Sequence, residues 1–352
     1  MEARRFFNRL MHWFSRNRRN DPWNGTDDPY AVWISEVMLQ QTVVSAVKPY
    51  FEAWMGRFPT LFHVASSPEE EVLRMWEGLG YYSRARNIHK TARILASEGR
   101  RSLPSTYNEL RSLPGIGDNT ARAVLSLAFG QKYPVLDANV RKVFMRFFLE
   151  EEWSKETASR VDLFVREGME GYPPGRVNEA LMQLGQAVCL RKRPRCPDCP
   201  LVSRCQARLS GREDSIPPPL IRDVTGKKTV LLIPVWNREV GILRKREGIG
   251  RGLWTFPDFS YEEGKAALSG LEERGRADIL PMTRQVHTYT RFRDELFPYL
   301  ICFRKKEDFK TLAEEMDFQP VDMDKLDTYP FLSAYRKITE EIKTLLTGDI
   351  SR

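Results

Sequence analysis

Four of the five cysteines lie in one basic, proline-broken stretch, AVCLRKRPRCPDCPLVSRCQA, at residues 187–207. Their spacing is Cys189-x6-Cys196-x2-Cys199-x5-Cys205. Four thiolates in one loop can bind a zinc ion or an iron–sulfur cluster, and the prolines between them stiffen the turns. The spacing alone favours zinc over a cluster, and the density of thiols argues against four unliganded cysteines. The stretch is therefore a candidate metal site.

Two carboxylates are candidates for acid–base chemistry. In PYAVWISEVMLQQTVVSAVKPYF, helical spacing puts Glu36 on one stripe with Leu39, Val43 and Val47. A carboxylate on an apolar stripe either finds a buried partner or has its pKa raised by desolvation, which suits a general acid. With another helix phase, Glu36 would simply be solvated. Asp137, in YPVLDANV, lies at an extended-to-helix transition, where capping of the next helix is the alternative to a chemical role.

The pentapeptide LPGIG, at residues 113–117, separates two predicted helices. Its glycines would let backbone N–H groups approach a phosphate, and the start of the next helix adds a favourable partial charge. A plain connection between two helices is the alternative. Leu113, Gly115 and Gly117 are thus candidate nucleic-acid contacts.

These residues must be positioned by two different kinds of structure. Up to about residue 206, turns separate amphipathic helical segments; a proline-rich stretch follows, and then short β-rich runs alternate with candidate helices at 261–275 and 332–346. We predict a mostly α chain with a C-terminal α/β domain. Its predicted parts are a six-helix lobe at about 28–134, a second lobe from 1–27 plus 135–206 (together residues 1–206), a linker at 207–228 and the α/β domain at 229–347.

Composition narrows the class of protein. The formal net charge is +8, which suits a polyanionic partner, and no apolar run approaches a membrane span of about 20 residues. The arginine-rich start, MEARRFFNRLMHWFSRNRRN, does not resemble a secretory signal but a basic amphipathic helix. Reduced cysteines fit a cytoplasmic protein, nucleoid-associated if it is bacterial. We also expect a monomer.

Several passages together resemble one enzyme family. WISEVMLQQT is similar to the WxSExMLQQT of the MutY family of adenine DNA glycosylases, and WEGLGYYSRARN and LPGIG followed by VLDANV resemble two further motifs of that family. The cysteine spacing resembles the [4Fe–4S] loop of the endonuclease III and MutY glycosylases, which reverses the preference for zinc. The resemblance to this superfamily of helix-hairpin-helix, iron–sulfur glycosylases is nearly continuous from about residue 16 to residue 206.

This resemblance implies a fold and a reaction. It implies a two-lobed helix-hairpin-helix glycosylase domain that grips double-stranded DNA containing a mispair or lesion and flips out adenine opposite 8-oxoguanine or guanine. Glu36 would protonate the adenine, while Asp137, aided by Asn139, would support the cationic sugar. The further residues implied to contact the substrate are Arg19, Gln41, Thr42, Tyr81 and Glu179, with Gln41 and Tyr81 as wedges in the duplex.

Position 119 bears on the outcome of the reaction. Bifunctional relatives carry a lysine there that forms a Schiff base with the sugar, and Asn119 has no such amine. We therefore expect a monofunctional glycosylase. MutY relatives usually carry serine or tyrosine at this position, so a catalytic role for Asn119 rests on its capacity to hydrogen-bond the substrate.

The C-terminal part resembles the Nudix-like module with which this family reads 8-oxoguanine. GRGLWTFPDF matches its GLWxFP signature, and the spaced glutamates of a catalytic Nudix box are absent, so pyrophosphate hydrolysis is not expected. The family's Phe-Ser-His loop aligns with Tyr289, Thr290 and Arg291, after His287. Arginine in place of histidine is a pure donor, which leaves lesion preference open.

Two other functions fit the same sequence. One is a monofunctional glycosylase of this scaffold that acts on another mismatch or lesion. The other is a catalytically silent DNA-binding protein, against which the presence of both Glu36 and Asp137 argues.

Overall fold

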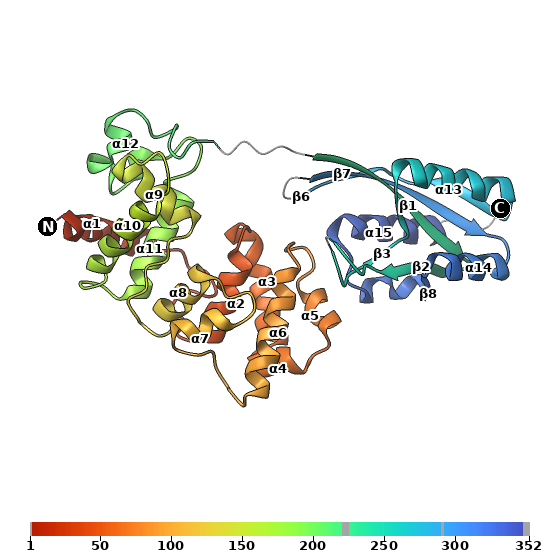
Figure 1. The fold of residues 1–352 in the computed structure, drawn as a ribbon, viewed down its shortest axis with the longest axis horizontal. Helices are drawn as coiled ribbons and strands as arrows, with labels where there is room; N and C mark the ends of the chain where they lie inside the picture. The colour runs from red at the N-terminus through yellow and green to blue at the C-terminus, as the bar shows by residue number, and fades with distance from the viewer. Residues whose placement is uncertain (1, 220–224, 249, 290–291, 348–352) are drawn as a thin grey trace. The chain divides into compact units, whose positions relative to one another are not determined.

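The structure is a computed structural model that describes residues 2–219, 225–248, 250–289 and 292–347. The chain divides into two compact units, residues 1–66 with 87–220 and residues 67–86 with 221–352 (Figure 1). Residues 67–86 thus group with the C-terminal part. The predicted boundaries at residues 206 and 228 stay a prediction.

The first unit is helical. Its elements are α1 (Glu2–Asn17), α2 (Pro29–Leu39), α3 (Val44–Arg57), α4 (Leu61–Ser66), most of α6 (Ser83–Ser97), α7 (Tyr107–Ser112), α8 (Asp118–Leu127), α9 (Ala138–Phe148), α10 (Lys155–Gly168), α11 (Pro174–Ala187), the 3₁₀ turns η1 (Cys196–Asp198) and η2 (Val202–Arg204), and α12 (Gln206–Leu209).

Helix α2 is a buried helix of this unit. Asp28 caps its N-terminus by accepting hydrogen bonds from the backbone N–H groups of Tyr30 and Ala31, and Pro29 occupies the first turn. The indole of Trp54 donates to the Tyr30 hydroxyl at 2.9 Å, so α3 is fixed against α2. Buried apolar contacts around α2 hold the helix that carries Glu36.

A separate core joins α1 to α9, α10 and α11. The predicted apolar face of α1 is confirmed, since Phe6, Phe7, Leu10 and Phe14 are buried and Trp13 is partly buried. Gly168 of α10 has no side chain because a Cβ there would lie 2.4 Å from the Phe7 ring. Part of the cysteine loop packs on the same core, so the packing of α1 also supports that loop.

The second unit contains a mixed sheet of order β3-β2-β1-β7-β5, with β4, β6 and β8 pairing β1, β7 and β2. The strands are β1 (Thr225–Trp236), β2 (Glu239–Arg244), β3 (Trp254–Thr255), β4 (Asp258–Ser260), β5 (Ala277–Pro281), β6 (Gln285–Tyr289), β7 (Phe292–Phe303) and β8 (Gln319–Asp322). The long strands β1 and β7 are parallel.

Helices cover both faces of this sheet. Helices α13 (Tyr261–Arg274) and α14 (Lys306–Met316) pack on one face, and α15 (Ser333–Thr347) packs on the other, after the turn η3 (Met323–Thr328). The prediction of a mostly α chain with a C-terminal α/β domain is confirmed, although α14 was not expected from the sequence. Helix α5 (Glu69–Met75) also belongs to this unit.

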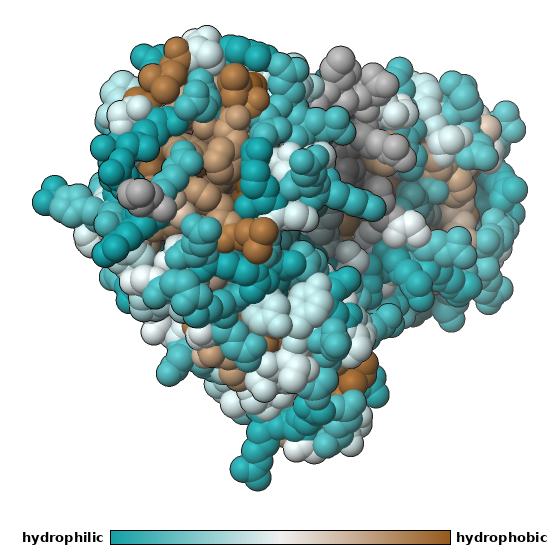
Figure 2. Space-filling view, turned by 60° about the vertical axis from the view of Figure 1, so that its left-hand side comes forward, coloured by the Kyte–Doolittle hydropathy of each residue, from teal (hydrophilic) through white to brown (hydrophobic). Residues whose placement is uncertain are grey.

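The surface agrees with the charged composition. Figure 2 shows a face on which hydrophilic side chains predominate around an apolar area at the upper left. Within the described ranges, no helix has the length and apolar character needed to cross a membrane.

Candidate active site

A cavity of about 1370 Å³ lies in the first unit, lined by α2, α8, α9, α11 and the segment that precedes α2. It brings together nine residues that the sequence analysis selected from distant positions. They are Arg19, Glu36, Gln41, Thr42, Gly117, Asn119, Asp137, Asn139 and Glu179. A cavity of this size is large enough for a nucleotide.

Glu36 lies near the end of α2 and is partly buried in the wall of the cavity. Its pKa is raised from 4.5 to about 8, mainly because burial disfavours the charged carboxylate and further because Asp137 and Glu179 bring negative charge nearby. The carboxyl group is therefore mostly protonated at neutral pH. That is the state in which it can donate a proton.

The expected stripe on this helix is wrong beyond Leu39. Helix α2 ends there, Gln41 has a left-handed backbone with φ of 58°, and Val43 is the N-cap residue of α3, with 69% of its surface exposed. The reversal of the chain at Gln40–Gln41 breaks the helical phase, so Val43 does not share the environment of Glu36. The desolvation of Glu36 comes from the cavity wall instead.

Asp137 is the N-cap of α9. Its Oδ1 accepts the Val140 backbone N–H at 2.8 Å, and its Oδ2 accepts from the Asn139 side chain at 3.0 Å. Capping of the helix and a chemical role for Asp137 are thus compatible, because the capping hydrogen bond orients a carboxylate that also lines the cavity. Gly185 allows this arrangement because a Cβ at that position would lie 2.7 Å from the Asn139 carbonyl oxygen.

Asn119 supports the same turn. Its Oδ1 accepts the backbone N–H of Leu136 at 3.2 Å, immediately before Asp137. The next residue, Thr120, accepts from the Gln40 side chain at 3.2 Å, which joins α8 to the end of α2. In this structure Asn119 is a positioning residue for the Asp137 turn.

Glu179, on the acidic side of the cavity, is paired with two arginines that the sequence analysis did not select. Glu179 pairs with Arg18 at 3.5 Å and with Arg176 at 3.3 Å. Arg19, the residue selected from the sequence, instead donates to Gln186 at 2.5 Å and pairs with Asp21 at 3.2 Å. Arg18 and Arg19 are neighbours of the same residue type, so the sequence does not show which of them pairs with Glu179. The fold does.

Asp21 is a further residue that the sequence analysis missed. Its side chain is 2% exposed, and it pairs with Lys48 at 2.8 Å in addition to Arg19. All three residues line the cavity. A lone aspartate before a proline gives no signal of such a buried ion triad in the sequence.

The LPGIG segment forms the predicted hairpin between α7 and α8. Leu113 is buried, and Gly115 has φ of 77° and approaches Asn87 so closely that a Cβ would lie 2.5 Å from the Asn87 Cβ. Gly117 is the N-cap of α8 and provides no side-chain acceptor, so the N–H groups of the first turn can bind an anion.

The negative charge of Asp118, which follows the hairpin, is balanced by neighbouring side chains. Partial burial alone would raise the pKa of Asp118, but hydrogen bonds from Tyr107 and Arg122 outweigh it and lower that pKa. Arg122 pairs with Asp118 at 2.9 Å and with Asp162 at 2.6 Å. The negative charge of Asp118 is therefore engaged locally beside the hairpin.

Both predicted wedge residues have a strained backbone. Gln41 has φ of 58° and Tyr81 has φ of 48°, a region that residues with a side chain rarely adopt. Both side chains are exposed, Tyr81 to 40%. Thr42, next to Gln41, donates its hydroxyl to the Gln40 carbonyl at 3.3 Å. Such strain is typical of residues that present a side chain to a ligand.

The four cysteines follow α11 and are partly buried. The buried guanidinium of Arg146 donates to the Cys189 sulfur at 3.2 Å and to the carbonyls of Leu190 and Arg191 at 2.6 and 3.0 Å. A guanidinium donor matches a thiolate better than a neutral thiol, so the surroundings of Cys189 fit a negatively charged ligand sulfur. Burial instead raises the pKa of the Cys196, Cys199 and Cys205 thiols. Among the residues that the structure describes, no group of three or more His, Cys, Asp or Glu side chains is arranged to hold one metal ion.

Only one of the three predicted lesion-reading residues lies within the described part of the chain. Tyr289 ends β6, and Thr290 and Arg291 lie outside the described residues. His287 is paired in register with Asp294, whose side chain accepts from Thr229 at 2.9 Å. Burial lowers the pKa of His287, and Asp294 opposes this effect.

Several known proteins are similar to this chain in sequence or in structure. Residues 34–167 match the family model described as HhH-GPD superfamily base excision DNA repair protein. The chain is 33% identical over 272 residues to the adenine DNA glycosylase of Buchnera aphidicola from Acyrthosiphon pisum, covering 75% of this chain and 77% of that one.

Two further proteins extend this comparison. The human adenine DNA glycosylase is 39% identical over 218 residues, which is 59% of this chain and 40% of the human protein. The solved structure of a thermostable thymine-DNA glycosylase aligns with a TM-score of 0.55 at 25% identity, covering 59% of this chain and 97% of the other.

Proposed function

Because the chain belongs to the adenine DNA glycosylase family of the HhH-GPD superfamily, we propose that it removes adenine paired with 8-oxoguanine or guanine in double-stranded DNA. The enzyme is an N-glycosyl hydrolase of base excision repair. We also propose that the enzyme prefers these opposite bases, that it acts as a monomer and that it works in the cytoplasm or nucleoid.

One observation carries the proposal. The cavity holds a carboxyl group that is protonated near neutral pH, Glu36, together with a carboxylate oriented by two hydrogen bonds, Asp137. Paired carboxyl groups with distinct environments are the usual means by which proteins hydrolyse glycosidic bonds. A protein that only held DNA would gain nothing from a buried, protonated acid.

The reaction follows from these roles. Glu36 donates its proton to the adenine, so that the bond between the base and C1′ of the sugar breaks and its electron pair leaves with the base. The negative charge of Asp137 stabilises the cationic sugar. A water oxygen then bonds to C1′ and releases a proton. Asn139 keeps the Asp137 carboxylate in place, and Asn119 holds the backbone before it.

DNA would be held around this cavity. The hairpin at 113–117 would bind phosphates, and Gln41 and Tyr81 would insert into the duplex. Side chains inserted into a duplex compensate for the stacking that is lost when a nucleotide is flipped out. Thr290 and Arg291, with Tyr289, would then read the opposite base.

The cysteine loop would hold a [4Fe–4S] cluster through Cys189, Cys196, Cys199 and Cys205. When bound, the cluster would supply structural stability to the loop and a fixed local charge. Arg146 orients Cys189 by its hydrogen bond, and Arg191, Lys192, Arg193 and Arg195 would be presented to phosphates. Iron and acid-labile sulfide measured in the purified protein test this assignment, and zinc alone would contradict it.

A substrate panel tests the proposed function. The protein is incubated with duplexes that contain A opposite 8-oxoguanine, A opposite G, T opposite G, or U opposite G, and released bases are identified by mass. We expect free adenine from the first two duplexes. The pyrimidine duplexes are included because a similar fold belongs to a thymine-DNA glycosylase, and faster release of thymine or uracil would overturn the proposal.

The same panel tests strand cleavage. Because Asn119 lacks an amine, we expect intact strands with abasic sites and no protein–DNA adduct after borohydride reduction. If a protein–DNA adduct is trapped as fast as the base is released, another nucleophile in the protein attacks the sugar.

A further inference from the structure

The turn that carries Tyr81 is attached to the sheet-bearing part of its own unit by an ion pair between Glu77 and Arg336. Residues 67–86 carry α5 and the turn, and they belong to the same compact unit as the sheet. We propose that Arg336 of α15 is a positioning residue for Tyr81, acting through Glu77. The inference rests on the proposed function, in which Tyr81 inserts into the duplex.

Glu77 and Arg336 form a two-pronged ion pair. The Nε and Nη2 atoms of Arg336 donate to the two carboxylate oxygens of Glu77, each at 2.7 Å. The side chains are only 16% and 23% exposed. A paired, partly buried geometry of this kind fixes direction as well as distance, unlike an exposed ion pair.

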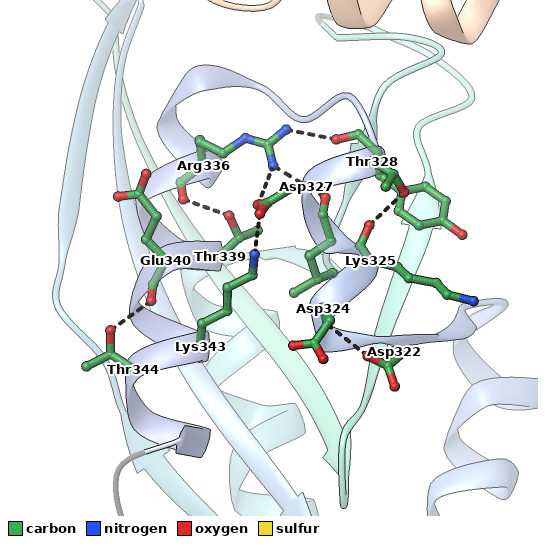
Figure 3. A network of polar contacts seen from close by, with 12 residues as sticks. Asp322, Asp324, Lys325, Asp327, Thr328, Arg336, Thr339, Glu340, Lys343 and Thr344 are labelled. Carbon is green, nitrogen blue, oxygen red and sulfur yellow. Dashed lines mark hydrogen bonds and ion pairs between the residues drawn. The ribbon is translucent and has the colours of Figure 1, made fainter.

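Arg336 is itself held rigidly on its own side. Its guanidinium donates to the carbonyls of Tyr329 at 2.9 Å and Leu326 at 3.3 Å and lies over the Phe331 ring. Figure 3 shows Arg336 pointing from α15 toward the η3 turn, where Lys343 also reaches Asp327. The arginine is therefore fixed before it meets Glu77.

Further contacts anchor the segment on both sides of Glu77. The Trp254 indole donates to Glu70 of α5 at 2.6 Å. Beyond the turn, the Tyr82 hydroxyl donates to the Phe331 carbonyl at 3.3 Å, and Arg86 donates to the Arg251 carbonyl. Glu77, four residues before Tyr81, and Tyr82, directly after it, are thus attached to the sheet-bearing part.

The turn between these anchors is strained and internally braced. Gly78, Gly80 and Tyr81 have φ of 100°, 71° and 48°. Arg84 donates to the Leu79 and Gly80 carbonyls at 2.9 and 3.1 Å and lies over the Tyr81 ring. A strained backbone persists only where its surroundings define it, and the residue directly before this turn is Glu77.

Loss of the ion pair should therefore affect the wedge and not the chemistry. Without Arg336 or the Glu77 charge, the turn samples conformations in which Tyr81 is not presented to DNA. Glu36 and Asp137 lie in the other unit, so the rate of bond cleavage in the bound complex should stay near that of the parent protein.

The test is a double-mutant cycle between Glu77→Gln and Tyr81→Ala. Glu77→Gln is preferred over Arg336→Gln because it keeps the contacts of Arg336 to the carbonyls; Arg336→Gln is the second variant. Affinity for a duplex with A opposite 8-oxoguanine and for a matched duplex is measured in a Glu36→Gln background, so that the duplex is not consumed. Arg238→Gln, which breaks the exposed pair with Asp324 in the same unit, is the control.

We expect Glu77→Gln to weaken mismatch binding roughly 3- to 30-fold, with a much smaller effect on the matched duplex. In the Tyr81→Ala background the same change should have no further effect, because the residue that it positions is absent. Arg238→Gln should leave both affinities unchanged. With Glu36 restored, single-turnover rates at saturating enzyme should match the parent protein.

Two results would overturn the inference. One is mismatch affinity that Glu77→Gln and Arg336→Gln leave unchanged. The other is a loss of mismatch affinity on Glu77→Gln that is equally large with Tyr81 and with Tyr81→Ala. That result would give the ion pair a general structural role. Failure of the proposed function is distinguishable, because it would appear as no base release by the parent protein whatever the outcome of the binding cycle.

Discussion

Glu36→Gln is expected to slow single-turnover release of adenine by ~10²- to 10⁴-fold, the usual contribution of a general acid. The amide has the shape of the carboxyl group but no proton that it can give up at neutral pH. Since Glu36 is mostly protonated at pH 7, the replacement changes little in the charge of the cavity. Rates are measured with enzyme in excess over a duplex with A opposite 8-oxoguanine.

The control for this variant is the affinity for the same duplex and the thermal midpoint of unfolding. Both should stay near the parent values, because a neutral amide replaces a mostly neutral acid in the same volume. A rate within about threefold of the parent protein would contradict the assignment of Glu36 as the acid.

Asp137→Asn is expected to slow the same step by ~10²- to 10³-fold, because it removes the negative charge that faces the developing sugar cation. Asparagine caps helices about as well as aspartate, so the hydrogen bond from the Val140 N–H is retained. The variant therefore separates the charge of Asp137 from its structural role. Single-turnover kinetics under the conditions used for Glu36→Gln give the comparison.

Asp137→Ala completes this comparison. It removes both the charge and the cap, and should cost about 1 kcal/mol of unfolding free energy, whereas Asp137→Asn should cost much less. If Asp137→Asn releases adenine as fast as the parent protein while Asp137→Ala is destabilised, Asp137 is only a helix cap.

The general fold and much of the cavity could be predicted from the sequence, because both depend on local patterns. The apolar face of α1, the strands β1 and β7 and the capping position of Asp137 all follow from periodicity and cap chemistry over a few residues. The hairpin at 113–117 follows from its two glycines in the same way.

The missed features depend on contacts between distant residues. The pairing of Glu179 with Arg18, 161 positions apart, cannot be separated from a pairing with Arg19 without the fold. The contact between Glu77 and Arg336 spans 259 positions and joins the turn after α5 to α15. The end of α2 at Leu39 was missed because the apolar pattern continues past the residue at which the backbone reverses.

The most direct test of the account is the pH dependence of adenine release under single-turnover conditions, between about pH 6 and pH 10, for the parent protein and Asp137→Asn. The acid must carry its proton, so the rate should fall as pH rises through the Glu36 pKa of about 8. Because the charge of Asp137 helps to raise that pKa, the fall should occur at lower pH in Asp137→Asn. A rate that does not change across this range, or a descending limb at the same pH in both proteins, would contradict the claim that these two carboxyl groups act together in one cavity.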